Sequence, residues 1–103
     1  MNVLIGGTGF IGTALAEVLV KNGEEVVSVS RSGRGSVLGV QYEGLDIADT
    51  EKLSEIISKG DDIFILTGQV GPGFDAEQEK ESLQNITDVL SNFPEKKAYY
   101  TSS

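Results

Sequence analysis

The sequence predicts an α/β fold, a doubly wound parallel sheet of five strands in the order 3-2-1-4-5 with helices on both faces. Two observations lead to it. Short apolar runs alternate with stretches of helical periodicity along all 103 residues, which is typical of βαβ units with right-handed crossovers. Glycine-rich turns separate these elements, and no repeat, low-complexity segment or linker divides the chain. We therefore treat residues 1–103 as one domain.

The first half of the chain supplies a helix between strands. Asn2–Ile5 is predicted as a buried strand. The helix that follows should bury one face, made of Ile11, Leu15, Val18 and Leu19. Lys21-Asn22-Gly23 should end it, with a cation in the last turn and a glycine that can adopt positive φ. The next segments are a strand at Glu25–Ser30, a loop at Arg31–Gly39 and a short strand at Val40–Gly44.

The second half repeats the alternation. Asp49 is placed to cap a helix that continues through Lys59, with a core stripe of Leu53, Ile56 and Ile57. Asp62–Leu66 is nearly all apolar, as a central parallel strand should be. A glycine-rich loop leads to a long helix over Asp75–Ser91 that should bury Leu83, Ile86, Val89 and Leu90. Pro94 prevents its continuation, and Ala98–Thr101 is the fifth strand.

Composition excludes several classes of function. The net charge of −8 argues against a general nucleic-acid or anionic-membrane surface. With neither cysteine nor histidine, the chain lacks disulfides, thiolate metal ligands and the commonest general base, so no metal site is expected. Met1 leads directly into Val3-Leu4-Ile5 without a positive leader, and no apolar run approaches the length of a membrane span. A cytoplasmic protein is therefore expected.

The most specific motif is a glycine loop between the first strand and the first helix. At such a junction, unpaired amide groups and the positive end of the helix dipole point outward together, and a pyrophosphate satisfies both. Gly6 permits the tight turn, Gly9 leaves no Cβ between backbone and phosphate, and Gly12 lets the helix pack closely on its strand. The alternative is a turn that merely tolerates glycine. A nucleoside-triphosphate loop is excluded, because Ile11-Gly12-Thr13 supplies no lysine.

Gly6-Gly7-Thr8-Gly9-Phe10-Ile11-Gly12, with glycines in the spacing G-x-x-G-x-x-G, resembles the loop of the extended or atypical short-chain dehydrogenase/reductases, the NAD-dependent epimerase/dehydratase family. The resemblance covers the whole chain. It implies a Rossmann-type NAD(P)-binding domain that is truncated after the fifth strand. In that family this loop binds the cofactor pyrophosphate, which would assign Gly6, Gly9, Phe10, Ile11 and Gly12 to the cofactor.

The resemblance also assigns residues to the adenosine half of the cofactor. NAD-preferring members usually place an aspartate on the ribose hydroxyls, where this chain has Ser30, followed by Arg31 and, close by, Arg34. A carboxylate accepts the 2′-hydroxyl, whereas a guanidinium matches a 2′-phosphate, so NADP is expected, with NAD as the alternative. The other reading is that both arginines are solvated loop charges. By the same resemblance, Asp46 and Ile47 would contact the adenine.

Two further segments are similar to family motifs. Leu66, Thr67 and Gly68 correspond to a strand end beside the cofactor ribose, although many such glycines simply turn the chain. The final Thr101-Ser102-Ser103 resembles the segment that supplies the catalytic hydroxyl, with Ser103 as the best candidate; a frayed polar tail is the other reading. The family's catalytic Tyr-x-x-x-Lys is absent, since none of the tyrosines has a lysine four residues on. The chain alone is therefore expected to be inactive.

Three functions follow. The chain is the dinucleotide-binding part of an oxidoreductase, epimerase or dehydratase, whose small-molecule substrate would need sequence beyond Ser103. Alternatively, it is a stand-alone nucleotide-binding or redox-sensing module. The third hypothesis is a remnant without activity that forms a homo-oligomer through its exposed last strand.

Overall fold

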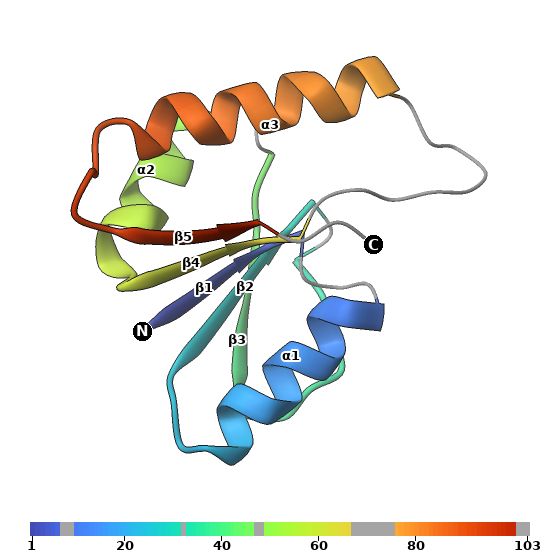
Figure 1. Cartoon of the computed structure of the whole chain (residues 1–103). Coiled ribbons are helices and arrows are strands. Elements are labelled where there is room, and N and C mark those ends of the chain that lie inside the picture. The colour runs from blue at the N-terminus through green and yellow to red at the C-terminus, as the bar shows by residue number, and fades with distance from the viewer. Residues whose placement is uncertain (7–9, 32, 47–48, 67–75, 101–103) are drawn as a thin grey trace.

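The computed structural model describes residues 1–6, 10–31, 33–46, 49–66 and 76–100. Within them, five parallel strands form one sheet in the order β3-β2-β1-β4-β5, which confirms the predicted fold class (Figure 1). The strands are β1 (Asn2–Ile5), β2 (Val26–Ser30), β3 (Val40–Gly44), β4 (Asp62–Ile65) and β5 (Lys97–Tyr100). The described helices are α1 (Phe10–Lys21), α2 (Thr50–Lys59) and α3 (Ala76–Leu90).

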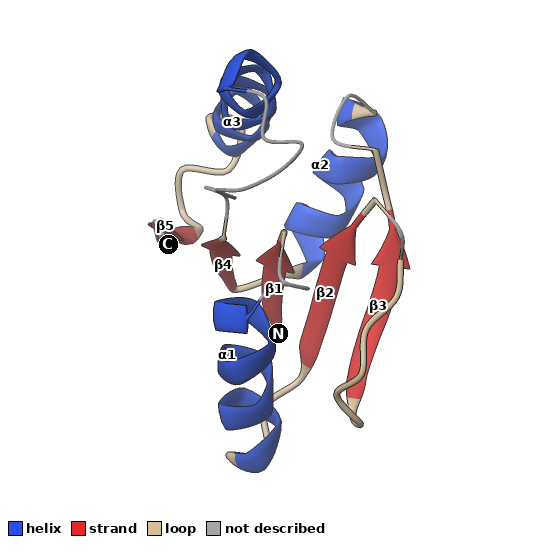
Figure 2. Ribbon diagram, turned by 90° about the vertical axis from the view of Figure 1, so that its right-hand side faces the viewer, coloured by secondary structure: helices blue, strands red, loops and turns tan. Residues whose placement is uncertain are grey.

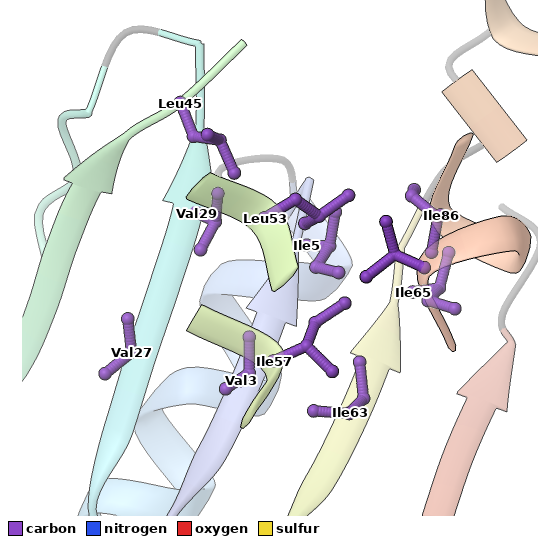
Figure 3. Packing of buried hydrophobic residues seen from close by; sticks show 11 residues of the cluster. Val3, Ile5, Val27, Val29, Leu45, Leu53, Ile57, Ile63, Ile65 and Ile86 are labelled. Atoms are coloured by element: carbon purple, nitrogen blue, oxygen red, sulfur yellow. The ribbon is translucent and has the colours of Figure 1, made fainter. Parts of the chain in front are cut away.

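Helices cover both faces of the sheet, with α1 on one side and α2 and α3 on the other (Figure 2). The larger core lies between the sheet and the α2–α3 layer, where Leu53 and Ile57 of α2 and Ile86 of α3 have no exposed surface. In Figure 3 these side chains meet alternate residues of the strands. Alternation places one set of strand residues on this side, namely Val3, Ile5, Val27, Val29, Ile63 and Ile65.

The smaller core lies under α1, and it corrects one prediction. Leu4 and Val26 of the sheet pack there with Ala16 and Leu19 of α1, whereas Val18, predicted to be buried, is 54% exposed. Successive helical residues point about 100° apart, so the burial of Leu19 turns Val18 away from the sheet. The buried face is centred on Gly12 and Ala16. Because both residues are small, they contribute little to the hydrophobic periodicity from which the buried face was predicted.

Both predicted helix ends are confirmed. At the end of α1, the amide of Gly23 donates to the Val20 carbonyl oxygen and that of Glu24 to the Leu19 oxygen, while Gly23 has a φ of +80°. This is the Schellman arrangement, which favours glycine at that position. At the start of α2, the Asp49 carboxylate accepts from the amide of Lys52 at 3.2 Å.

Other boundaries differ from the predictions by one residue. β2 begins at Val26, β4 ends at Ile65 and β5 begins at Lys97. The predicted helix start at Asp75 and strand end at Thr101 lie outside the described residues. Each of the four residues of β5 is exposed, as expected of an edge strand. Among the described helices, none has the length and apolarity that crossing a membrane requires.

Candidate cofactor-binding edge

Those predicted site residues that the structure describes lie toward the carboxyl edge of the sheet, where the parallel strands end together. Ile5 pairs with Val29 and with Ile65, and Ser30 pairs with Gly44. The chain therefore leaves β1, β2, β3 and β4 at the same edge (Figure 1). Ligands of open α/β sheets bind outside this edge, where the strand order reverses, and here that point lies between β1 and β4.

Gly6 makes the turn out of β1, beside the end of β4. Its amide donates to the Val29 carbonyl at 2.9 Å, and its φ is +80°. The amide of Leu66 donates to the carbonyl of Ile5, also at 2.9 Å. A Cβ on Gly6 would lie 2.9 Å from the Leu66 carbonyl oxygen, closer than real Cβ atoms approach. Both the backbone angle and the space therefore require glycine, and the structure brings Gly6 and Leu66 together.

The start of α1 follows this turn. The first amides of any helix have no acceptor within the helix and carry its positive dipole end. No acidic side chain stands in the first turn of α1, so nothing there competes electrostatically for an anion. Gly12 lies in the same turn and is buried, and its role in close helix packing stays a prediction.

The end of β2 leads into the loop with the arginines. The Ser30 hydroxyl accepts a hydrogen bond from the amide of Gly33 at 3.1 Å. Arg31 and Arg34 are exposed, and the sequence contains no other arginine. In a protein with a net charge of −8, this loop is thus a local concentration of guanidinium groups suited to an anion.

The end of β3 lies next to that loop. The amide of Leu45 donates to the Ser30 carbonyl at 2.9 Å, and its side chain is buried in the larger core. Asp46 follows and is exposed, while its carbonyl accepts from the amide of Asp49 at 2.8 Å. The fold therefore brings Ser30, Arg31 and Asp46 to neighbouring strand ends.

Several predicted site residues lie outside the described part of the chain: Gly9, Ile47, Thr67, Gly68 and Ser103. Phe10 and Ile11 are described only through the backbone of the first turn of α1. Their assignments remain predictions.

The contacts that fix residues 31–39, the arginine loop, were not predicted from the sequence. Gly33 and Gly44 approach each other backbone to backbone, and the Tyr42 hydroxyl accepts from the amide of Val37 at 3.0 Å. The sequence did contain a signal, the two glycines at Gly33 and Gly35. Glycine-rich composition predicts a loop there, but it does not indicate close contacts with β3.

Comparison with known proteins gives a family match over nearly the whole chain. A family model described as the NAD dependent epimerase/dehydratase family matches residues 3–103. Over a short stretch of 32 residues, the chain is 59% identical to an uncharacterized chloroplastic protein of Arabidopsis thaliana. That stretch is 31% of this chain and 11% of the plant protein.

Solved structures share the fold. The UDP-glucose 4-epimerase of Thermotoga maritima, solved with UDP-glucose, superposes with a TM-score of 0.76 at 23% identity over 100% of this chain. The enzyme of Bifidobacterium longum, in complex with NAD+ and UDP, gives 0.74 at 22% identity over 100%. That of Brucella ovis, in complex with NAD, gives 0.76 at 20% over 96%. This chain spans 38%, 37% and 34% of those chains, respectively.

Proposed function

This chain belongs to the NAD dependent epimerase/dehydratase family, and on that premise we propose that it binds NADP along the carboxyl edge of its sheet. The observation that carries the proposal is the Gly6 turn. There the left-handed backbone and the close Leu66 carbonyl exclude a side chain at residue 6, at the carboxyl end of β1 and four residues ahead of the first residue of α1. The structural neighbours solved with NAD support a nicotinamide dinucleotide as the ligand class.

The proposal assigns residues to both halves of such a cofactor, including some that lie outside the described part of the chain. In the proposal, the pyrophosphate lies against the amides between Gly6 and Gly12, and Leu66, Thr67 and Gly68 lie beside a ribose. Ser30, Arg31 and Arg34 take the adenosine side, with Asp46 and Ile47 at the adenine. A 2′-phosphate would find two guanidinium groups there and no carboxylate in the position of Ser30, which favours NADP over NAD.

When bound, the nicotinamide ring would accept or give up a hydride. The residues of this chain bind and orient the dinucleotide. No tyrosine within the sequence has a lysine four residues on, so we propose that these 103 residues alone do not turn over a substrate. Epimerase, dehydratase or reductase chemistry, with Ser103 as a hydroxyl near the substrate, is proposed for a protein that includes further sequence, as the longer structural neighbours do. A cytoplasmic location is a proposal of the same kind.

Titration of the purified full chain with NADPH and NADH, followed by nicotinamide fluorescence, tests the proposal. We expect Gly9→Val to weaken both ligands by about tenfold or more, because a side chain would stand between backbone and phosphate. Arg31→Ala should weaken NADPH relative to NADH by about tenfold, the loss of a charge-assisted contact. Lys21→Ala, which removes an exposed cation at the far end of α1, is the control and should change neither affinity. Unchanged binding by Gly9→Val would refute the pyrophosphate site.

A further inference from the structure

The connection between β2 and β3 is unusual for a parallel pair. Parallel neighbours are joined by a crossover, usually a dozen or more residues with a helix. Here residues 31–39 make the connection, and those that the structure describes form neither helix nor strand. The connection runs back along β3 from the carboxyl to the amino edge of the sheet (Figure 2). A segment of this kind needs contacts of its own to keep one shape.

Two glycines fix the start of the connection to the end of β3. Gly33 has a φ of +67°, and a Cβ there would lie 2.8 Å from both the nitrogen and the Cα of Gly44. Those are backbone atoms of a strand, which cannot move aside as a side chain would. The Ser30 hydroxyl accepts from the amide of Gly33 at 3.1 Å, which closes the turn that contains Arg31.

Tyr42 fixes the middle of the connection. A Cβ on Gly35 would fall 1.9 Å from the Tyr42 ring, so the ring lies directly against the Gly35 backbone. The Tyr42 hydroxyl accepts from the amide of Val37 at 3.0 Å. Val37 itself packs against the smaller core. Arg34 is therefore held between two fixed points, Gly33 at the Gly44 backbone and Gly35 under the ring.

We infer that Tyr42 and Gly33 are positioning residues for cofactor selectivity: they hold Arg31 and Arg34 at the carboxyl edge before a ligand arrives. The inference rests on the proposed function. Long cationic side chains lose conformational entropy when they bind a ligand. If the backbone that carries them is already fixed, binding does not cost additional backbone entropy. A looser connection would let the arginines spread over more positions. The affinity for a 2′-phosphate would fall, while contacts to the pyrophosphate would stay.

Tyr42→Phe is the sharpest test, because it deletes the hydrogen bond to Val37 and keeps the ring against Gly35. In the full chain, we expect the ratio of the NADH to the NADPH dissociation constants to fall by about three- to tenfold, the usual effect of one hydrogen bond. NADH affinity should change little, and the unfolding temperature followed by circular dichroism should fall by no more than about 4–8 °C, the loss that one hydrogen bond implies for folding. Gly33→Ala should lower the ratio further. Gly23→Ala is its matched control, since Gly23 also has positive φ but no atom within 4 Å of an added Cβ.

The outcomes distinguish the positioning role of Tyr42 and Gly33 from dinucleotide binding itself. If Arg31→Ala lowers the ratio and Tyr42→Phe leaves it unchanged, or weakens both ligands equally, the positioning role is overturned and dinucleotide binding stands. A wild-type chain without preference for NADPH overturns the positioning role in the same way. Binding of neither dinucleotide refutes the proposed function, and the inference with it. Where Gly33→Ala fails to fold, Tyr42→Phe decides alone.

Discussion

Among single residues, Gly6 has the strictest steric demand at the candidate site. Its positive φ is one that L side chains adopt only with strain, and an added Cβ would also meet the Leu66 carbonyl oxygen at 2.9 Å. Gly23 has the same φ of +80° in open space. The pair thus separates the cost of the backbone angle from the cost of the contact.

We predict that Gly23→Ala lowers the free energy of unfolding by about 1 kcal/mol, the cost of the angle, and Gly6→Ala by about 2–4 kcal/mol, since a backbone clash is added. Urea denaturation of both variants measures the difference. Equal losses would mean that the ends of β1 and β4 move apart easily, and that the turn is less fixed than the structure indicates.

A second residue-scale feature is the ion pair at the amino edge of the sheet. The amino group of Met1 donates to the Asp61 carboxylate at 2.6 Å. The hydrogen bond and the charge of Asp61 raise the pKa of the amino group above its usual 8.0, although partial burial opposes this. The same hydrogen bond and the positive charge lower the pKa of Asp61 below its usual 3.8.

The directions of these shifts fix the pH window of the pair. A raised pKa stabilises the fold below pH 8.0 and loses that effect as pH rises through the folded-state value. A lowered pKa stabilises above pH 3.8 and loses the effect as pH falls through the folded-state value. We predict that Asp61→Asn lowers the unfolding temperature at pH 6, and that the difference from wild type shrinks as pH rises above 8.0 through the folded-state pKa of the amino group. The difference should be small, because the Asp61 side chain is exposed. Glu55→Gln, which removes another exposed ion pair, is the control for the loss of a surface carboxylate and should change the unfolding temperature little at pH 6. A difference that does not shrink at all as pH rises above 8.0 would contradict this ion pair.

At the scale of elements, periodicity predicted strands and helices well because it reports which side of an element is apolar. The buried residues Leu53, Ile57 and Ile86 were predicted from spacing alone, and their helices lie where expected. The face of α1 was misjudged at Val18 because the true contact is made by small residues, which carry little hydrophobic signal. The contact of the Tyr42 ring with Gly35 could not be predicted, because it depends on where the loop folds back and not on the hydrophobic periodicity of the sequence.

The contact of α1 with β2 includes a polar residue. Ser28 pairs with Leu4 across the sheet, so it shares the α1 side, and it is 1% exposed. Among the side chains that the structure describes, its hydroxyl is buried without a hydrogen-bond partner. An unpaired buried hydroxyl loses its hydration with nothing in return.

We predict that Ser28→Ala raises the free energy of unfolding by about 0.5–1 kcal/mol, because the unpaired group is removed and little volume is lost. Ser91→Ala, which removes an exposed hydroxyl bonded to the Asp88 carbonyl just after α3, is the control and should not stabilise the chain. Thermal or urea unfolding compares them. A clear loss in Ser28→Ala would indicate that the hydroxyl is satisfied in solution by a buried water.

At the scale of the whole molecule, the two edges of the sheet differ. β3 is bordered by the connection of residues 31–39, which is bonded to Tyr42 of β3 through the amide of Val37. At the other edge, all four residues of β5 are exposed. Tyr99 stacks on Phe64 with ring centroids 5.0 Å apart, yet Tyr99 remains 44% and Tyr100 58% exposed. An edge strand with unpaired backbone groups and exposed aromatic rings is a template for pairing with another strand.

We therefore predict that this chain associates with itself through β5, in a concentration-dependent manner visible by sedimentation velocity. Tyr100→Lys should shift the population to monomer, because a charge on an edge strand would be desolvated in the paired form. Leu38→Lys is the control: Leu38 is 90% exposed, but it precedes β3 at the opposite edge, so its loss should leave association unchanged. If both lysine variants reduced association equally, general apolar adhesion would explain it better than strand pairing. If Tyr100→Lys had no effect, another surface would have to carry the contact. Because β5 lies beyond β4 from the arginine loop, we further expect Tyr100→Lys to keep the wild-type preference between NADPH and NADH.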